Sequence, residues 1–420
     1  MKYRIVPSKI SGTVRAPPSK SETHREMILS ALSSGTSVLY NPLISYDTEA
    51  TLSGIQALGA FVSRDGDVLR ITGGDLHAAD TCIDCRNSGT TLRLLTGVAA
   101  RLSGTTRFTG DSSLMRRPMR PLLSALESCG AAVSVEGDCI SVTGPVTPGT
   151  AEIRGDVSSQ FVSALLLAGI SVRLTTPLVS APYADMTVSA LVNRGVSAAK
   201  TADGFSVSGA GHPKPREVFI EGDWTSAAYL LTLGALCGTA AVTGLNPRGL
   251  QGDVRILSIL RSFGARVSVD GDSVTASNPA SANPKATLAC CSLNLSDTPD
   301  LFPAAAVLAA RAEGISRIYG VSQQIYKESN RLSEVSALLS AMGAKTALQQ
   351  DCFTVEGGKL CGAELFASGD HRLFMAAVLA GLCAEGTTEI DAAGGAYDEV
   401  YAVSYPGFLR DVRLLGGNIE

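Results

Sequence analysis

Cationic and acidic side chains gather in short segments of this sequence. Residues 19–21 read Ser-Lys-Ser and are followed by Arg25, while Lys327, Glu328 and Arg331 lie within five residues of one another. Arginine grips carboxylate or phosphate with a planar fork, whereas lysine is a mobile point charge that can donate a proton. Carboxylates beside cations in a closed site are the usual ingredients of general acid and base catalysis. The segments therefore predict chemistry on a compact, multiply charged anion.

Polar clusters of this kind occur six times, each followed directly by an apolar run. They are Ser19-Lys20-Ser21, Asn87-Ser88-Gly89-Thr90, Ser158-Ser159-Gln160, Asp223-Trp224-Thr225-Ser226, Asp297-Thr298-Pro299-Asp300 and Gly369-Asp370-His371-Arg372. Ser, Thr, Asn and Asp before an apolar run are helix N-cap residues, and runs without a polar stripe predict buried helices. The free N–H groups at such helix starts attract anions. Together they predict one anion-binding centre, although each cluster taken alone is equally well explained as a helix cap.

The elements that position these clusters recur along the chain. Each unit contains an apolar stretch of helical spacing closed by a glycine, followed by a β-rich segment that is often split by a Gly-Asp or Asp-Gly turn. The closing glycines are Gly59, Gly130, Gly195, Gly264, Gly343 and Gly416, separated by 71, 65, 69, 79 and 73 residues. This regularity predicts six structural units. Because 420 residues exceed one typical domain, three units per domain is the natural division.

Composition and charge exclude several classes of protein. A formal net charge of −4 and a pI near 5.7 argue against a polyanion-binding surface, and the low aromatic content of 5% argues against a stacking platform for nucleic acid. The ten cysteines lack framework spacing, which favours reduced thiols in the cytoplasm. The CxxC of Cys82 and Cys85 has no second copy, and the chain has only four histidines, so no zinc site is expected.

Targeting, membrane and nucleotide-binding motifs are also not expected. The first ten residues contain no apolar stretch typical of a targeting segment. The longest uncharged stretch, residues 224–247, contains three glycines and several threonines, which favours a buried helix leading into a strand over a membrane span. Neither a strand-associated GxGxxG nor a GxxxxGK[ST] motif is present.

Eight motifs in series identify a known family. In order they are SKSETHR, NSGTTLR, Arg-Pro after a Leu-Met segment, SSQF, EGD before a small-residue helix, PDLFP, KES-R and GDHR. Each is weak alone, but together they resemble the 5-enolpyruvylshikimate-3-phosphate synthase family of enolpyruvyl transferases across almost the whole chain. The resemblance implies an α/β fold with two domains, each of three βαβαββ-type repeats with buried helices and outward-facing sheets, an inside-out α/β barrel. Residues 1–14 and 221–420 would form the lower domain and residues 15–220 the upper domain, with a substrate cleft between them.

The resemblance also implies an activity. Members of the family transfer the enolpyruvyl group of phosphoenolpyruvate to the 5-hydroxyl of shikimate 3-phosphate, releasing phosphate, in the pathway to chorismate and the aromatic amino acids. No metal or organic cofactor is expected. We expect a cytoplasmic monomer that acts on small molecules, with neither nucleic acid nor membrane as a partner.

Site residues follow from the family motifs position by position. The catalytic candidates are Asp300, Glu328 and Lys20. Shikimate 3-phosphate would be bound by Lys20, Ser21, Arg25, Ser158, Ser159, Gln160, Ser180, Asp300, Gln323 and Lys327, with Tyr183 as a further candidate. Phosphoenolpyruvate would be bound by Lys20, Gly89, Arg117, Gln160, Arg331 and Arg372.

Five positions depart from the family pattern. Arg86 stands where glycine is usual, Asn330 replaces Asp, Ile325 replaces Arg and Gln323 replaces Asn. Val403 occupies the place of a lysine that contacts phosphoenolpyruvate. Either Arg86 compensates for the lost cations or phosphoenolpyruvate binding is weakened.

Three other functions remain open at this point. Enolpyruvyl transfer to a UDP-sugar is disfavoured because no cysteine lies in a glycine-rich loop like that of the relative with this activity. RNA 3′-phosphate cyclisation on a related repeat is opposed by the acidic pI and the few histidines. A non-catalytic, anion-binding paralogue is supported only by Val403 and Arg86.

Overall fold

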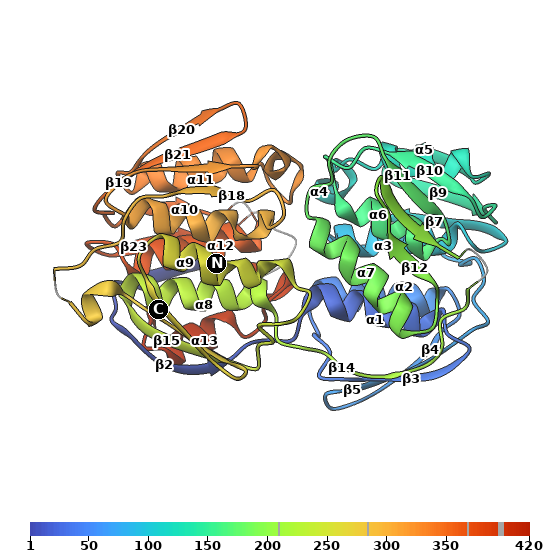
Figure 1. Ribbon diagram of the computed structural model, residues 1–420, viewed down its shortest axis with the longest axis horizontal. Helices are drawn as coiled ribbons and strands as arrows, with labels where there is room; N and C mark the ends of the chain where they lie inside the picture. The colour runs from blue at the N-terminus through green and yellow to red at the C-terminus, as the bar shows by residue number, and fades with distance from the viewer. Residues whose placement is uncertain (209–210, 284, 368, 394–398) are drawn as a thin grey trace. The chain divides into compact units, whose positions relative to one another are not determined.

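Contacts within the chain divide it into two compact units. The computed structural model describes residues 1–208, 211–283, 285–367, 369–393 and 399–420 (Figure 1). One unit comprises Met1–Pro17 and Gly222–Glu420, and the other comprises Pro18–Glu221. We refer to them as the split unit and the inserted unit and describe each by itself.

The strands of the described residues form six four-stranded sheets with one shared topology. In each sheet the first two strands are parallel, the third is antiparallel to the second, and the fourth is antiparallel to the third. The same order holds in the split unit. This repetition confirms the six units expected from the spacing of the closing glycines.

The inserted unit contains three of these sheets. The first sheet contains, in spatial order, β14 (Glu217–Phe219), β3 (Gly35–Tyr40), β5 (Val68–Gly73) and β4 (Phe61–Asp65). The second contains β6 (Ile83–Asp84), β7 (Gly104–Thr109), β9 (Cys139–Gly144) and β8 (Ala132–Glu136). The third contains β10 (Thr150–Ile153), β11 (Ser171–Leu174), β13 (Gly204–Val207) and β12 (Ala198–Lys200). Its helices are α1 (Lys20–Ala31), α2 (Tyr46–Ala57), α3 (Gly89–Ala99), α4 (Ser112–Met115), α5 (Arg120–Ser128), α6 (Ser159–Leu167) and α7 (Ala181–Asn193).

The split unit repeats the pattern. Its first sheet contains, in spatial order, β2 (Ile10–Arg15), β15 (Gly238–Thr243), β17 (Ser273–Ser277) and β16 (Arg266–Asp270). The second contains β18 (Ser292–Asn294), β19 (Gly314–Tyr319), β21 (Cys352–Gly357) and β20 (Lys345–Gln349). The third contains β22 (Glu364–Phe366), β23 (Thr388–Asp391), β1 (Lys2–Val6) and β24 (Asn418–Ile419). Its α-helices are α8 (Trp224–Cys237), α9 (Ile256–Ser262), α10 (Phe302–Arg311), α11 (Arg331–Ala341), α12 (His371–Leu382) and α13 (Phe408–Leu414). Short 3₁₀ helices span Gly252–Arg255, Pro279–Ser281, Pro299–Leu301, Ser322–Tyr326 and Val400–Val403.

Three repeats follow the chain directly as βαβαββ, and the other three borrow a strand. The repeats that begin at β6, β10 and β18 are continuous in sequence. Strand β2 precedes α1 along the chain but pairs with β15, whereas β14 precedes α8 but pairs with β3. The repeat that contains α1 therefore takes β14 as its first strand, and the repeat that contains α8 takes β2. The last repeat is completed by β1, from the N-terminus of the chain.

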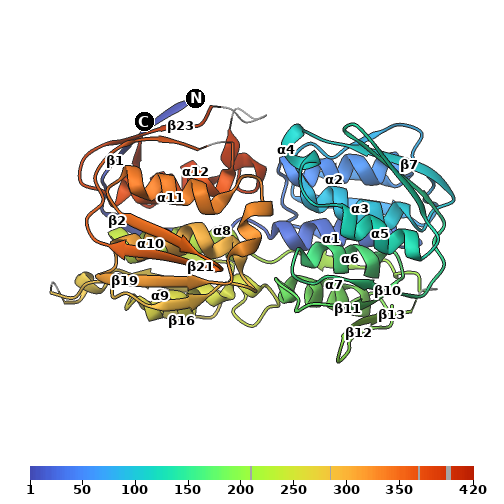
Figure 2. The same cartoon turned by 90° about the horizontal axis from the view of Figure 1, so that it is seen from above.

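In each unit the helices lie inside and the sheets lie outside (Figure 2). Helix α8 is buried from Trp224 to Leu236, and α10 and α12 are buried along nearly their whole length. On β7 the residues Thr106 and Phe108 are buried while Thr105 and Arg107 are exposed, because alternate strand residues face opposite sides of a sheet. Each fully buried leucine of these helices stabilises the fold by roughly 1.5–3 kcal/mol.

The closing glycines end the second helix of every repeat. All six have positive φ values, at 104°, 97°, 81°, 85°, 93° and 97° along the chain, and each follows the C-cap residue of its helix. A left-handed residue at this position satisfies the last helical carbonyls, and glycine adopts it without a Cβ penalty. The glycine pattern in the sequence is therefore a helix-stop signal.

The uncharged stretch of residues 224–247 forms a buried helix and a strand, as predicted. Helix α8 ends at Cys237, and β15 begins at Gly238. None of the helices in the described ranges is both long enough and apolar enough to cross a membrane.

Candidate active site

The first predicted polar cluster forms the start of the first helix of the inserted unit. Ser19 is the N-cap of α1, and its side chain accepts a hydrogen bond from the Glu22 amide. Lys20 is the first residue of the helix. Its Nζ lies 2.7 Å from Oδ2 of Asp47 on α2, and both side chains are largely buried. Asp47 was not predicted, and it fixes the position of the Lys20 ammonium.

Arg25 lies one turn further along α1 and is 3% exposed. Its guanidinium donates to Oγ1 of Thr187 and to the carbonyl of Tyr183, both on α7, at 2.8 Å each. A third bond of 2.8 Å goes to the carbonyl of Ser21. Burial lowers the pKa of Arg25 to about 10, which leaves the group charged at neutral pH. Arg25 thus joins α1 to α7 and brings a buried positive charge to the start of α1.

A further predicted cation of the inserted unit lies beside the start of α3. Ser88 is the N-cap and Gly89 the first helical residue. Arg117 donates to Oδ1 of Asn87 at 2.6 Å, and its Nη1 would lie 3.2 Å from a Cβ atom on Gly89. A side chain at residue 89 would therefore crowd the guanidinium, so glycine lets the cation reach the helix start.

Helices α6 and α7 supply hydroxyl and amide groups. Ser158 is the N-cap of α6, and Ser159 and Gln160 are its first two residues. Gln160 bonds to Thr90 and Arg93 of α3, at 2.9 and 2.6 Å. Ser180, at the start of α7, is buried and has a left-handed φ of 55°.

Three predicted cations of the split unit converge on one carboxylate. Oδ1 of Asp300 lies 3.1 Å from both Lys327 Nζ and Arg331 Nη1, and Oδ2 lies 3.0 Å from Arg372 Nη2. Arg331 also forms ion pairs with Glu328 and, at 2.8 Å, with Asp370. The structure therefore brings together the predicted residues of the fifth and sixth repeats.

Asp300 is not a helix cap. It lies inside the 3₁₀ helix Pro299–Leu301, where Thr298 precedes the first residue, and its carboxylate oxygens bond to cations. Asp370 does cap α12, through bonds to the amides of Arg372 and Leu373, while it also binds Arg331. Capping thus explains the cluster at Asp370 but not the cluster at Asp300.

The ion pairs of this cluster shift the titration of its members. Burial by itself would raise the pKa of Asp300, but Arg372, Lys327 and Arg331 hold that pKa well below its usual range. Burial would also lower the pKa of Arg372, yet the charge of Asp300 raises it overall. Nη1 of Arg372 is buried and has no hydrogen-bond partner among the described residues. This donor points to an anionic ligand, because a buried N–H of a guanidinium is costly to leave unbonded.

Sequence reasoning missed a buried acid in the split unit. Asp253, in the 3₁₀ helix Gly252–Arg255, is 1% exposed and accepts a hydrogen bond of 2.5 Å from Thr225, the second residue of α8. Burial, together with the nearby charge of Asp300, raises the pKa of Asp253 to about 7. Only the polar start of α8 was a sequence signal for this pair.

Gln323, predicted to bind shikimate 3-phosphate, forms a hydrogen bond within its own loop. It is 4% exposed, and its Nε2 donates to the carbonyl of Gly320 at 3.0 Å. The contacts of its side chain in this structure support the turn before the 3₁₀ helix Ser322–Tyr326.

Two of the other departures from the family pattern, Arg86 and Asn330, have local partners. Arg86 adopts a left-handed φ of 52°, and its side chain pairs at 3.3 Å with Glu49 of α2, which takes up part of its charge. Asn330 is the N-cap of α11 and accepts a bond from the Ser333 amide. Val403 is 3% exposed and Ile325 is 45% exposed.

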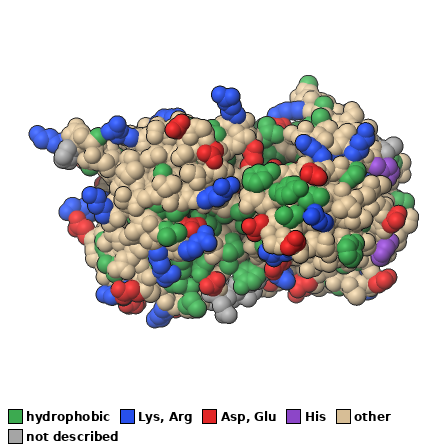
Figure 3. Space-filling model, turned by 90° about the horizontal axis from the view of Figure 1, so that it is seen from below, with side chains coloured by type: hydrophobic (Ala, Val, Ile, Leu, Met, Phe, Trp, Pro, Cys, Tyr) green, Lys and Arg blue, Asp and Glu red, His purple; other side chains and the backbone are tan. Residues whose placement is uncertain are grey.

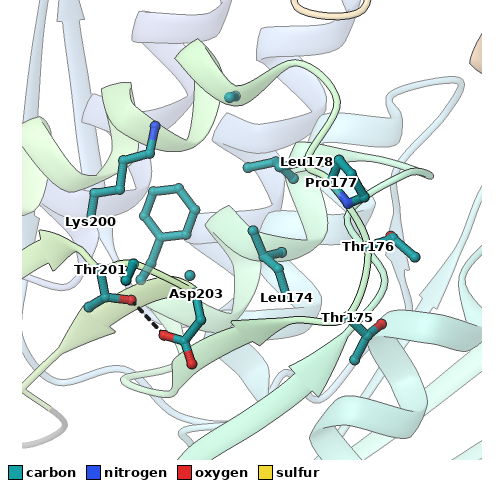
Figure 4. Close-up of a pocket in the computed structure, with 12 residues that line it drawn as sticks. Leu174, Thr175, Thr176, Pro177, Leu178, Lys200, Thr201 and Asp203 are labelled. Carbon is teal, nitrogen blue, oxygen red and sulfur yellow. Dashed lines mark hydrogen bonds between the residues drawn. The ribbon is translucent and has the colours of Figure 1, made fainter.

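Charged side chains of both signs are mixed on one face of the molecule. On the face shown in Figure 3, the described Lys and Arg side chains are interspersed with Asp and Glu and form no continuous basic patch. The inserted unit has a hollow (Figure 4) that is lined by Leu174, Thr175, Thr176, Pro177, Leu178, Ala181, Lys200, Thr201, Ala202, Asp203, Gly204 and Phe205. None of these described lining residues is a predicted substrate ligand.

The fold matches solved enolpyruvyl transferases. The chain resembles the EPSP synthase of Acinetobacter baumannii with a TM-score of 0.79 and 26% identity, covering 100% of this chain and 99% of that chain. It also shares its fold with the enolpyruvyl transferase NikO of Streptomyces tendae, with a TM-score of 0.76 and 20% identity, covering 100% of this chain and 98% of that chain. The architecture is therefore that of the enolpyruvyl transferases.

The sequence places the chain more narrowly. Residues 6–412 match the family model of EPSP synthase, 3-phosphoshikimate 1-carboxyvinyltransferase. The 3-phosphoshikimate 1-carboxyvinyltransferase of Methanocorpusculum labreanum is 46% identical over 100% of both chains, and that of Halobacterium salinarum is 41% identical over 100% of both. The chain belongs to the EPSP synthase family.

Proposed function

We propose that this protein transfers the enolpyruvyl group of phosphoenolpyruvate to the 5-hydroxyl of shikimate 3-phosphate, yielding 5-enolpyruvylshikimate 3-phosphate and phosphate. The observation that carries the proposal is the match to the EPSP synthase family over residues 6–412, with relatives of this named activity at full length. The product belongs to the route to chorismate and the aromatic amino acids.

The substrate roles are carried over from the motifs of the family. Shikimate 3-phosphate is bound by Lys20, Ser21, Arg25, Ser158, Ser159, Gln160 and Ser180 of the inserted unit and by Asp300, Gln323 and Lys327 of the split unit. Phosphoenolpyruvate is bound by Lys20, Gly89, Arg117, Gln160, Arg331 and Arg372. Two phosphates and two carboxylates repel one another, and cations with helix starts offset that repulsion. The buried, unpartnered Nη1 of Arg372 supports its role as an anion ligand.

The acid and base roles follow from protonation states. Asp300 is held as a carboxylate by its three cations, which is the form that accepts a proton from the 5-hydroxyl. Anionic substrates draw those cations away from Asp300 and so raise its affinity for that proton. Lys20 and Glu328 are the other proton-transfer candidates. The hydroxyl oxygen bonds to the enol carbon as the methylene gains a proton, and the adduct then loses phosphate and a methyl proton.

Acceptor choice separates this function from transfer to a UDP-sugar. Purified protein is given phosphoenolpyruvate with an equimolar mixture of shikimate 3-phosphate and a UDP-sugar, and the products are resolved by mass spectrometry. We expect enolpyruvyl mass to appear only on shikimate 3-phosphate. Product on the UDP-sugar alone would overturn the assignment, and no product on either would favour a binding paralogue.

A cytoplasmic monomer is also part of the proposal. The ten cysteines of the chain are free, including Cys237 and Cys383 near the ends of α8 and α12, which is in keeping with a reducing compartment. Size-exclusion chromatography with light scattering measures the mass directly. A particle of about 43.4 kDa supports the monomer, and a multiple of that mass contradicts it.

A further inference from the structure

Helices α3 and α6 of the inserted unit are joined by an arginine at each end. Arg93 of α3 donates from Nη1 to Oε1 of Gln160 at 2.6 Å, and Arg101, just beyond α3, donates to the carbonyl of Leu167 at 3.1 Å. Between them the backbones come so close that a Cβ on Gly97 would lie 2.2 Å from a carbonyl oxygen of α6. The contact at Arg93 is therefore made between two closely packed elements.

Arg93 is a buried side chain and not a solvated surface charge. Its residue is 8% exposed, and its guanidinium carbon lies 5.3 Å from the centre of the Phe161 ring. Nη1 would lie 3.4 Å from a Cβ on Gly89, beside Arg117. The side chain folds back along α3 to the helix start, where phosphoenolpyruvate is proposed to bind.

The bond from Arg93 decides which way the amide of Gln160 points. A guanidinium has only donors, so the group facing it must be the oxygen of the amide and not its NH2. Nε2 of Gln160 is then turned to Thr90, to which it donates one hydrogen at 2.9 Å. Its second hydrogen is left for an anionic substrate. If the amide were reversed, it would present an oxygen to that anion and repel it.

We propose that Arg93 is a positioning residue that holds the Gln160 amide in the donor orientation for phosphoenolpyruvate. The inference rests on the proposed function, because the anion beside Gln160 is the substrate assigned there. Arg93 acts through Gln160 and not by touching the substrate.

Two substitutions of Arg93 distinguish control of the orientation of the Gln160 amide from the mere presence of a hydrogen bond to it. Lysine has only donors, so Arg93→Lys still requires the amide oxygen to face it. A glutamine side chain donates and accepts, so Arg93→Gln can bond to either orientation of the Gln160 amide. We expect R93Q to raise KM for phosphoenolpyruvate by about tenfold and R93K to raise it by less than about threefold, the scale of one hydrogen bond to a charged group.

The same variants are made in Gln160→Ala, where no amide remains to be oriented. We expect R93Q to cause no further rise in KM in that background, and Arg101→Met to leave KM unchanged while it lowers thermal stability. Equal effects of R93Q with and without Gln160, or equal effects of R93K and R93Q, would overturn the inference. If wild-type protein shows no turnover, the proposed function fails instead, and that result is distinct from any of these.

Discussion

At the residue scale, Asp300 is the central side chain of the proposed active site. This side chain is about a quarter exposed, with 24% of its surface accessible, and its two oxygens bind three cations that come from two different repeats. A carboxylate so placed organises Lys327, Arg331 and Arg372 before any substrate arrives. It is also held in the form that accepts a proton, so the proposed function gives this residue both a positioning and a catalytic role.

Asp300→Asn keeps the shape of the side chain but removes its charge and its basicity. We expect kcat to fall at least about 100-fold, the lower range of general acid and base contributions. Steady-state kinetics with both substrates measures the loss. Glu356→Gln, which removes a carboxylate from the exposed pair with Lys345 in the same unit, is the matched control and should change kcat less than about twofold. A kcat for Asp300→Asn close to that of the control would rule out Asp300 as the base.

Asp253 should give the fold a measurable pH dependence. Its pKa is raised to about 7 in the folded protein, so the folded state favours the protonated acid. Its contribution is full below the unfolded pKa near 4 and is lost as the pH rises through about 7. Asp253→Asn cannot titrate, so the stability of wild type relative to the variant should fall between pH 5 and pH 8. At about 1.4 kcal/mol per pKa unit, the two units between pH 5 and the folded pKa correspond to a difference of at most about 3 kcal/mol. Urea midpoints at the two pH values report it, and parallel pH profiles would contradict the assignment.

At the element scale, each repeat depends on its closing glycine. Gly343 has a φ of 93° and open space around a Cβ, and Gly358 also has open space but no left-handed φ. The pair separates backbone strain from crowding. We expect Gly343→Ala to lower the free energy of unfolding by about 1–2 kcal/mol and Gly358→Ala to change it by less than about 0.5 kcal/mol. Chemical denaturation of both variants measures the difference, and equal effects would mean that φ is not the cause.

Local signals explain how much of the site could be predicted. Caps and glycines act within one turn of helix, so the helix starts that carry Lys20, Gly89, Gln160 and Arg372 could be located from the sequence. The residues that position these groups could not. Arg93 lies 67 residues from Gln160, Asp47 lies 27 from Lys20, and Asp253 lies 28 from Thr225.

The pairing of the strands could not be predicted from local sequence patterns, for the same reason. The exchange of β2 and β14 between repeats joins strands more than 170 residues apart, for example Phe219 with Tyr40 and Gly238 with Ile10. No periodicity within either strand encodes which distant strand it will join. The repeat count could therefore be predicted from the residue pattern, whereas the crossing of the chain between units was expected only from the resemblance to the family.

At the scale of the whole molecule, a chain of net charge −4 carries several of its proposed anion-binding groups at buried helix starts. Binding of shikimate 3-phosphate should stabilise the folded protein by mass action. At a hundredfold excess over Kd we expect about 2.7 kcal/mol, and no stabilisation by a UDP-sugar at the same concentration. Thermal unfolding with each compound tests this, and stabilisation by the UDP-sugar alone would contradict the proposed acceptor.

Phosphate release tests the central claim most directly. Purified protein is given shikimate 3-phosphate and phosphoenolpyruvate together, with each substrate alone as the control. We expect phosphate release only when both substrates are present. The rate of release should fall at least about 100-fold in Asp300→Ala and in Arg117→Ala. Tight binding of shikimate 3-phosphate without any phosphate release would contradict the transferase and leave a protein that only binds anions.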